Sequence, residues 1–295
     1  MDSNCPLCNS SKTNKLWQGK GTLSGTEIGY SYACANDLKF KPTIFKCNEC
    51  RHLFSDKSTW PSKTGEDYAQ VVDTNYLALE KVKSKTFQRA ARIADGFFSQ
   101  PKRMIEVGSY TGVFLSAMEQ NGWECTGIEP SRWAAEISRT KGFNVLNGTL
   151  DQIVGQGLLV PVDLVVSWDV LEHVISPRDF MTEICNLVSE KGILIISTLD
   201  RTNYFARVTG KNWPWIVNMH LHYFDQETVI KMAAEQGFRL IRTRPHVHYA
   251  TISYILEKIL GHRSLVNLLS SRTLFSRISL PIGFGDVRYY VFEKN

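Results

Sequence analysis

Two Cys-x-x-Cys pairs lie near the beginning of this chain, and their spacing is typical of a metal site. Cys5 and Cys8 form the first pair, and Cys47 and Cys50 form the second after 38 intervening residues. Each pair can place two sulfur ligands on one ion, and two pairs complete a closed tetrahedral site. We therefore predict a structural ion, zinc ahead of iron, that holds together a segment with too little apolar content to fold alone.

Two other interpretations of these cysteines stay open. They could be unrelated thiols, or one pair could be a redox site like that of thioredoxin, although such a site needs a strand-helix-strand unit that this region lacks. Cys34 lies between the pairs and could replace one ligand. Cys125 and Cys185 fall on apolar strand and helix positions, so we expect them in the core. With seven cysteines and no secretory signal pattern, a framework of disulfides is not expected.

A glycine-containing turn and two acidic residues could bind a nucleotide-like cofactor. The turn, EVGSYTG at 106–112, joins an apolar run to a helical pattern and would expose backbone N–H groups to a ligand. The glycines alone are weak support, because any tight strand-to-helix turn needs small residues. Glu129 ends the next apolar run, where a carboxylate can accept hydrogen bonds from two ribose hydroxyls. Glu106 would repel a pyrophosphate but suits the cationic end of S-adenosylmethionine, so we predict that cofactor rather than NAD.

Histidines are the candidates for moving a proton. Glu172 and His173 directly follow another apolar run, where the end of a strand opens onto a site. His173 could remove the proton of an attacking hydroxyl, or the pair could cap the following turn and orient the loop. His220 and His222 would point the same way on a strand and could bind a metal, but no third ligand is apparent nearby. We therefore expect one of these two to contact substrate and the other to be a buried core residue.

The elements that must position these residues alternate between strands and helices from residue 102 onward. Short apolar runs predict strands at 103–108, 123–129, 143–148, 162–168 and 192–198. Helical patterns lie at 113–122, 131–142, 176–188 and 225–238, the last capped by Asp225. Two closing strands are expected at 238–247 and 287–294. Strands that are apolar throughout and alternate with helices indicate a parallel sheet covered on both faces.

Three parts are expected along the chain. Residues 1–57 form the metal-binding module, 58–100 a helical connection, and 101–295 the main domain, with a helical segment inserted at about 249–286. Within the connection, residues 66–98 show apolar positions spaced by three and four, as in a helix. The insertion mixes apolar and basic residues, so it could be core, a dimer contact or an interfacial helix near lipid.

Composition limits the partners and the location. The chain is 43% apolar and 21% charged, as expected of a globular protein. Its net charge of +5 permits an anionic ligand but is too small and too scattered to indicate nucleic acid. The N-terminus lacks a signal-peptide pattern and no apolar run approaches the length of a membrane span, so we expect a soluble, cytoplasmic protein.

These motifs resemble those of the class I S-adenosylmethionine-dependent methyltransferases, over about residues 100–243 and 287–294. They are EVGSYTG at 106–112, GIEP at 127–130, and WDVLEHV at 168–174 followed by SPRDFMTEI. A four-cysteine module ahead of such a domain resembles the branch that methylates sugars in antibiotic, capsule or lipopolysaccharide pathways. The resemblance implies an α/β fold, with a doubly wound, seven-stranded Rossmann-like sheet and a small N-terminal module like a zinc ribbon.

The resemblance also implies cofactor contacts from the turns that end four strands. They are, in chain order, Glu106, Gly108, Tyr110, Gly112, Glu129, Pro130 or Ser131, Leu150, Asp151, Trp168 and Asp169. The first turn would line the methionine portion, the second would hold ribose and adenine, the third would border the adenine, and the fourth would face the amino-acid group. Tyr110 replaces a usual glycine, so its turn should be stiffer than normal. In related sugar methyltransferases, a Glu-His pair at the place of Glu172 and His173 serves as base or positions the substrate.

We therefore expect an enzyme that methylates a hydroxyl, or less readily a carbon, of a nucleotide sugar or growing glycan. Its partners would be small molecules or glycans, without nucleic acid and with at most peripheral membrane contact. Three alternatives stay open: an RNA or protein methyltransferase that binds substrate through the metal module, a catalytically silent module that keeps the cofactor fold, and an NAD oxidoreductase. The segment 201–217 contains Arg207, Lys211, Trp213 and Trp215, which could grip a sugar diphosphate or belong to an ordinary loop.

Overall fold

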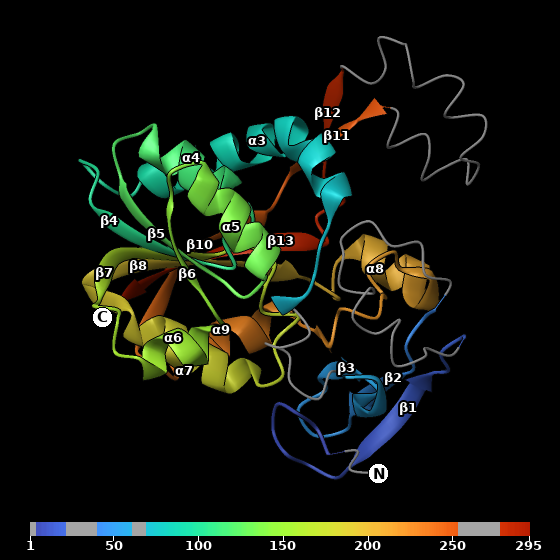
Figure 1. The fold of residues 1–295 in the computed structure, drawn as a ribbon. Coiled ribbons are helices and arrows are strands. Elements are labelled where there is room, and N and C mark those ends of the chain that lie inside the picture. The colour runs from blue at the N-terminus through green and yellow to red at the C-terminus, as the bar shows by residue number, and fades with distance from the viewer. Residues whose placement is uncertain (1–3, 22–39, 61–68, 253–277) are drawn as a thin grey trace.

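The structure, a computed structural model, describes residues 4–21, 40–60, 69–252 and 278–295, and Figure 1 shows their arrangement. Its strands are β1 (Thr13–Trp17), β2 (Ile44–Cys47), β3 (Leu53–Ser55), β4 (Arg103–Val107), β5 (Glu124–Glu129), β6 (Asn144–Asn147), β7 (Val162–Ser167), β8 (Val188–Leu199), β9 (His222–Tyr223), β10 (Phe238–Pro245), β11 (His248–Thr251), β12 (Ser279–Ile282) and β13 (Val287–Lys294). Its helices are α3 (Thr74–Asp95), α4 (Val113–Glu119), α5 (Arg132–Thr140), α6 (Leu150–Gly155), α7 (Pro177–Asn186), α8 (Tyr204–Thr209) and α9 (Gln226–Ala234), with short 3-10 turns η1 (Lys57–Thr59) and η2 (Gly210–Asn212).

A seven-stranded sheet forms the centre, in the order β10-β13-β8-β7-β4-β5-β6. The strands from β8 to β6 pair in parallel, whereas β13 is antiparallel to both of its neighbours. The predicted α/β fold class is therefore confirmed, and each of the seven predicted strands is present. The chain reverses its direction across the sheet between β4 and β7, and ligands bind such sheets outside the carboxyl ends of the strands at a reversal.

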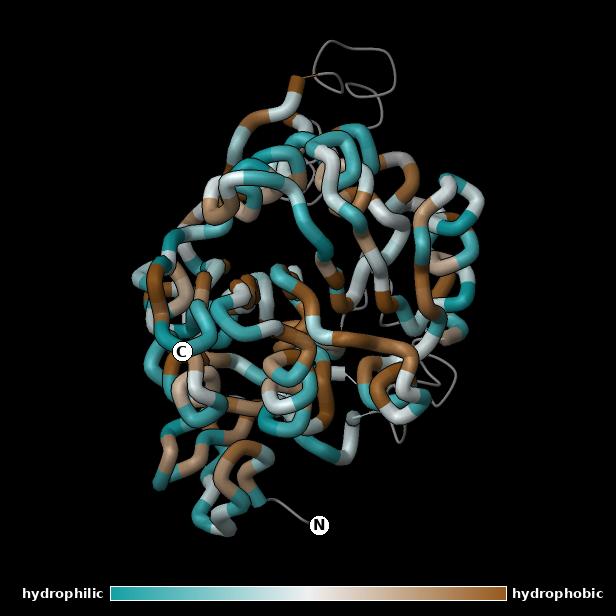
Figure 2. The backbone as a smooth tube through the Cα atoms, turned by 90° about the vertical axis from the view of Figure 1, so that its left-hand side faces the viewer, coloured by the Kyte–Doolittle hydropathy of each residue, from teal (hydrophilic) through white to brown (hydrophobic). Residues whose placement is uncertain are grey.

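Helices cover both faces of this sheet. Figure 1 shows α3, α4 and α5 on one face and α6, α7 and α9 on the other. Along these outer helices the backbone in Figure 2 alternates between hydrophobic and hydrophilic colours, as expected where one side packs on a sheet. In β7, Leu164, Val165 and Val166 are 0% exposed, and burial of each such side chain contributes about 1.5–3 kcal/mol. Cys125 and Cys185 are buried in the apolar layers on the two faces, as predicted.

Local sequence sets where the helices begin and end. The Asp225 side chain accepts a hydrogen bond from Thr228 N–H at 2.9 Å, so the predicted cap of α9 is confirmed. The helical pattern over 66–98 extends beyond the helix, because α3 begins only after Asp73, whose side chain accepts from Tyr76 N–H. Gly96 follows the last residue of α3 and donates its N–H to the Arg92 carbonyl at 3.2 Å.

The N-terminal module shares a sheet with the main domain. Its strands pair in the order β1-β2-β3, and β9 from the main domain adds to the edge of β3. In that pairing Leu53 lies opposite Tyr223 and Phe54 lies opposite His222. A further contact comes from Arg178 in α7, whose Nε donates to the Leu7 carbonyl at 2.7 Å.

The predicted helical insertion at 249–286 falls mostly on residues 253–277, which lie outside the described residues, as does Cys34. The described ends of the insertion include β12 and most of β11, and these two strands pair antiparallel as a two-stranded ribbon. Within the described ranges, every helix is too short or too polar to span a bilayer.

Candidate active site

The turn after β4 brings the backbone close to the sheet edge. Gly108, Tyr110 and Gly112 have positive φ angles of 82°, 46° and 80°. A Cβ at Gly108 would lie 2.5 Å from Val170 Cγ2, and one at Gly112 would lie 2.6 Å from Phe143 Cδ2, so larger residues are excluded at both. A left-handed Tyr110 costs of order 1–3 kcal/mol, which the surrounding structure must offset. The result is a backbone cradle of the kind that a nucleotide-like ligand needs.

Two buried carboxyl groups lie at this turn. Glu129 Oε2 accepts from Tyr110 N–H at 2.8 Å, and its Oε1 accepts from Ser131 N–H at 2.7 Å. Burial raises the pKa of Glu129 to about 7, although these two N–H bonds oppose the rise. Glu106 is also buried, and its Oε2 has no hydrogen-bond partner among the described residues. Burial and the charge of Glu129 raise the pKa of Glu106 well above its usual range. A cationic ligand that carries hydroxyl groups fits this pair.

Aromatic rings support the same turn. The Tyr110 ring lies 4.3 Å from that of Tyr76 in α3 and 6.1 Å from that of Trp133 in α5, both edge-to-face. Each such pair contributes about 0.5–1.5 kcal/mol. These contacts hold the Tyr110 ring in place, whereas the stiffness of the turn itself stays a prediction. Tyr76 and Trp133 were not identified from the sequence, because only the folded chain brings them to the turn.

The other predicted cofactor residues differ in exposure. Pro130 is half-buried beside Glu129, Leu150 is buried in the core, and Asp151 is exposed in the first turn of α6. Trp168 is buried, with its ring 5.4 Å from that of Phe114 and 5.1 Å from that of His246. The Trp168 ring therefore contacts both Phe114 and His246.

Asp169 follows β7 with a φ of 55° and faces two histidines. The Ser197 hydroxyl donates to Asp169 Oδ1 at 2.5 Å. The Asp169 N–H in turn donates to Ser197 Oγ at 2.9 Å. His248 Nε2 lies 4.0 Å from Asp169 Oδ2 and has no hydrogen-bond partner in the described part of the chain. Burial raises the pKa of Asp169, but His248, His246, the Ser197 hydrogen bond and Lys83 together hold that pKa below its usual value.

His246 and His248 were not predicted as site residues. The signal was present, because HVH at 246–248 repeats the alternation of HLH at 220–222. At the end of an expected strand, however, such alternation does not distinguish a functional pair from buried core residues.

Glu172, His173 and His220 come together beyond the end of β7, and one ligand-type atom of each lies within 4.8 Å of the others. His173 Nδ1 donates to the Met219 carbonyl at 2.8 Å, and His220 Nδ1 donates to the Trp215 carbonyl at 2.7 Å. Because a carbonyl only accepts, both neutral rings carry their proton on Nδ1 and a lone pair on Nε2. Such a cluster can take a proton from a hydroxyl or bind a divalent cation.

Burial sets the protonation of this cluster. It lowers the pKa of His173 to about 4 and that of His220 to about 3, so both rings are neutral at pH 7. Burial, together with the charge of Asp169, raises the pKa of Glu172 to about 8. Thr198 Oγ1 donates to Glu172 Oε2 at 2.8 Å. A neutral histidine in this position is in the form that accepts a proton.

The prediction that His220 and His222 point the same way is wrong. His220 lies in a turn before β9, with its N–H 3.2 Å from the Val217 carbonyl, so the two rings leave the chain toward different neighbours. The His220 ring contacts that of His173, whereas His222 Nε2 donates to the Val174 carbonyl at 2.8 Å. His222 Nδ1 then accepts from His52 Nε2 of the N-terminal module at 3.1 Å. Both histidines are buried, and only His220 joins the predicted Glu172–His173 pair, because the group that could hold a metal ion is Glu172, His173 and His220.

The predicted cysteine cluster is present in the N-terminal module. The Sγ atoms of Cys5, Cys8, Cys47 and Cys50 all lie within 4.8 Å of one another. The Cys5–Cys50 and Cys8–Cys47 Sγ distances are 3.5 and 3.6 Å, well beyond the roughly 2.05 Å of a disulfide. A tetrahedron with bonds of about 2.3 Å has edges of about 3.8 Å, so these dimensions fit a four-coordinate ion.

The two tryptophans of the segment 201–217 are hydrogen-bonded to the carboxylate of Asp286. Trp213 and Trp215 both donate their indole N–H to Asp286 Oδ2, at 2.8 and 2.9 Å. Trp213 is buried in a small apolar cluster, and the segment is not simply a loop, because it contains α8 and η2. Arg207 and Lys211 remain exposed.

The Glu129→Gln variant is expected to bind S-adenosylmethionine at least about tenfold more weakly, because the amide loses the charge and one acceptor. In the wild type the affinity should fall as the pH drops below about 7, where Glu129 gains a proton, and level off above it. Titration calorimetry at pH 6, 7 and 8 measures both effects. Glu119→Gln, an exposed acid at the end of α4, is the control. Unchanged affinity in Glu129→Gln would remove this residue from the cofactor site.

Comparison with known proteins gives one family match and several relatives. A family model described as a methyltransferase domain matches residues 78–243. The mitochondrial ubiquinone biosynthesis O-methyltransferase of Schizosaccharomyces pombe is 34% identical over 107 residues, which are 34% of this chain and 39% of that protein. The ubiquinone biosynthesis O-methyltransferase of Maricaulis maris is 24% identical over 57% of this chain and 69% of its own length. The chain thus spans about two fifths of the first relative and about two thirds of the second.

Solved structures share the fold. An S-adenosylmethionine-dependent methyltransferase from Archaeoglobus fulgidus matches with a TM-score of 0.53 at 17% identity, over 75% of this chain and 100% of its own. A Thermotoga maritima protein, described as a possible histamine N-methyltransferase, matches with a TM-score of 0.50 at 19% identity, over 75% of this chain and 93% of its own.

Proposed function

This chain belongs to the class I S-adenosylmethionine-dependent methyltransferases, and from that membership we propose that it methylates a hydroxyl oxygen of a small-molecule acceptor. The cofactor supplies a methyl group already activated by its positive sulfur, so the protein must align the acceptor and remove its proton. The observation that carries the proposal is the cluster of Glu172, His173 and His220 beside the carboxyl ends of β7 and β8. The curated relatives are named O-methyltransferases, which supports oxygen as the atom methylated.

Each group in the site has a role in this proposal. Glu106, Glu129 and the backbone of the turn at 108–112 hold the cofactor. His173 accepts the hydroxyl proton at Nε2, and its Nδ1–H bond to the Met219 carbonyl stabilises the charge that the ring then gains. Asp169, fixed by Ser197, keeps negative charge near the reacting groups.

For the acceptor class we propose a nucleotide sugar or a glycan. Its support is the four-cysteine module ahead of the methyltransferase domain, in the arrangement that resembles the sugar-methylating branch. A precursor of ubiquinone is the second candidate, because the curated relatives are named for that biosynthesis. Those alignments cover only part of each relative, so they support this candidate without assigning it.

We also propose that Cys5, Cys8, Cys47 and Cys50 bind a structural zinc ion. Four sulfurs would fill its coordination sphere and leave no position for a substrate. The sulfur–sulfur distances of 3.5 and 3.6 Å support this.

Turnover of labelled S-adenosylmethionine with a panel of acceptors tests the proposal. The panel holds nucleotide sugars, free glycans, hydroxylated quinone precursors, and RNA and protein controls. Methylation of a hydroxyl on a small molecule or a glycan supports it, and methylation of RNA or protein alone overturns it. A chelator that leaves the cysteine-bound zinc in place then separates two roles of the Glu172, His173 and His220 cluster. Unchanged kcat assigns proton transfer to His173, whereas a loss that Mg²⁺ restores assigns the cluster to a second metal ion.

A further inference from the structure

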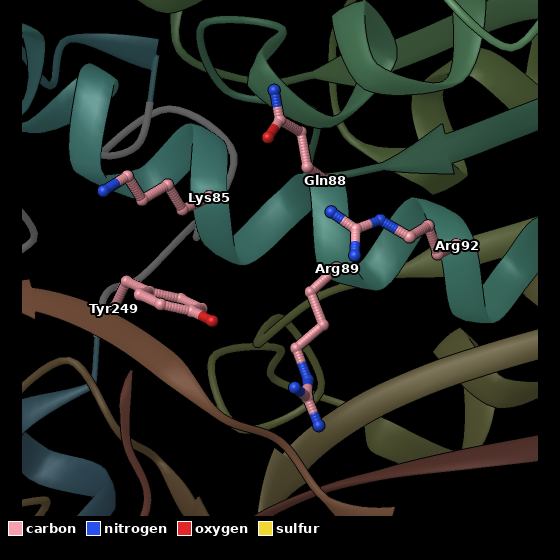
Figure 3. Close-up of a pocket in the computed structure, with 5 residues that line it drawn as sticks. All are labelled: Lys85, Gln88, Arg89, Arg92 and Tyr249. Atoms are coloured by element: carbon pink, nitrogen blue, oxygen red, sulfur yellow. The ribbon is translucent and has the colours of Figure 1, made fainter. Parts of the chain in front are cut away.

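A cavity of about 220 Å³ lies on the outer side of α3 beside β11, away from the turns described above (Figure 3). Its lining consists of Lys85, Gln88, Arg89, Arg92 and Tyr249. The three cations are four and three residues apart, which places them on one face of the helix. Among the described residues, no acidic side chain lines the cavity.

The positive charge of this cavity is not neutralised within the described residues. Lys85 Nζ donates to Ser279 Oγ at 2.8 Å, and neither Arg89 nor Arg92 forms an ion pair in the described part of the chain. By contrast, Glu80 near the start of α3 is paired, because its Oε1 lies 2.7 Å from Nζ of Lys141, which follows α5. Like charges four apart on a helix repel by about 0.2–0.5 kcal/mol per pair. A bound anion would relieve that repulsion.

The groups in the cavity suit a phosphate. A guanidinium presents a planar fork of N–H donors that matches two phosphate oxygens, and a lysine supplies a further point charge. Gln88 and Tyr249 also line the cavity and carry neutral donors, an amide and a hydroxyl. Tyr249 N–H donates to Thr86 Oγ1 at 2.8 Å, which holds β11 against α3. Pockets for whole drug-sized ligands measure about 300–1,000 Å³, so this cavity fits a phosphate or diphosphate group rather than a complete nucleotide.

Strand β11 connects the cavity with the candidate active site. Tyr249 follows His248, and consecutive strand residues point to opposite sides. On the inner side, His248 Nε2 lies 4.0 Å from Asp169 Oδ2. Burial and then the charge of His248 lower the pKa of His246 to about 3, and the charge of Arg89 makes a smaller contribution to that lowering. An anion in the cavity would therefore lie one strand away from the acceptor side of the site.

We propose that this cavity binds the phosphate or diphosphate group of the methyl acceptor. The inference rests on the proposed function and deepens it, because it names a phosphorylated molecule as the substrate class. The sequence suggests that the segment 201–217 could grip a sugar diphosphate, but the indoles of Trp213 and Trp215 bind Asp286 there. We therefore place the phosphate contacts on α3 instead.

Titration calorimetry of inorganic diphosphate with the zinc-loaded full chain measures whether the cavity at α3 binds an anion. The experiment needs no S-adenosylmethionine. The Arg89→Gln/Arg92→Gln variant should raise Kd at least about tenfold, because it removes two charge-assisted contacts. Arg103→Gln/Lys231→Gln removes the same charge from exposed positions outside the cavity and should change Kd by less than about twofold. No binding by the wild type, or an equal loss in both variants, would overturn the proposal.

Kinetics and vesicles separate the sources of the phosphate. With a phosphorylated acceptor, the Arg89→Gln/Arg92→Gln variant should raise KM at least about tenfold with little change in kcat. With the dephosphorylated acceptor, variant and wild type should behave alike. Sedimentation with phosphatidylglycerol vesicles that depends on Arg89 and Arg92, without diphosphate binding, would assign the cavity to a lipid surface and overturn a soluble acceptor. If S-adenosylmethionine binds and diphosphate does not, this inference alone fails; if S-adenosylmethionine does not bind, the proposed function fails.

Discussion

His173→Ala is expected to lower kcat by about 10²- to 10⁴-fold, the usual contribution of a general base. The affinity for S-adenosylmethionine should change by less than about twofold, because His173 groups with Glu172 and His220 rather than with the carboxyl groups of Glu106 and Glu129. Single-turnover rates together with calorimetry on the same preparation measure the two quantities separately.

The pH profile distinguishes proton transfer from a structural role. Burial lowers the pKa of His173 to about 4, so the neutral ring that accepts a proton predominates above that pH. The wild-type rate should therefore fall as the pH drops through about 4 on account of this group, and the variant should lose that dependence. His173→Gln, which keeps a side-chain donor for the Met219 carbonyl, should fold normally and remain as slow as the alanine variant. A kcat near the wild-type value would refute the assignment and leave His248, beside Asp169, as the candidate base.

Cys47→Ser is expected to lose the metal ion and to unfold the N-terminal module. Structural zinc sites contribute an apparent 10–16 kcal/mol or so to the folding of small modules, far more than one thiol contributes by packing. The effect should reach the main domain, because β3 pairs with β9 and His52 donates to His222, which lies two residues after His220 of the proposed catalytic cluster. Metal analysis measures the loss of the ion, and thermal unfolding measures the loss of stability. Hydrogen exchange of residues 220–224 shows whether the effect reaches β9.

The matched control for this variant is Cys185→Ser, which changes a buried thiol in α7 outside the cluster. This variant should keep one full equivalent of metal, and the amides of β9 should stay protected from hydrogen exchange, even if the lost core packing lowers the overall stability. Metal-free Cys47→Ser protein with wild-type exchange in β9 would contradict a structural role for the ion.

Local patterns account for what could be predicted from the sequence. Short apolar runs between helical patterns are enough to identify β4 to β8, because strands buried on both faces are apolar throughout. Glu129 and the Glu172–His173 pair could be placed at one sheet edge, because the ends of parallel strands meet there. The cysteine cluster was predictable because the spacing within each pair is set by the geometry of a single turn.

The rest depends on contacts between distant parts of the chain. The approach of His220 to His173 needs a turn before β9 that the alternation of histidines does not reveal. His248 reaches Asp169, and Tyr76 reaches Tyr110, only because α3 and β11 pack over the sheet edge. From the sequence, the cations of α3 look like an ordinary solvated helix face, and only the structure shows that no acid among the described residues lines the cavity beside them.

The pairing of β3 with β9 has a consequence for anyone who dissects this enzyme. A fragment that starts at α3 would leave the main-chain N–H and C=O groups of Tyr223 and its neighbours without their partner strand. Bare strand edges of this kind recruit other chains, so such a fragment should be poorly soluble even though its large sheet is complete. Supplying residues 1–60 as a separate, zinc-loaded polypeptide should restore solubility by occupying that edge.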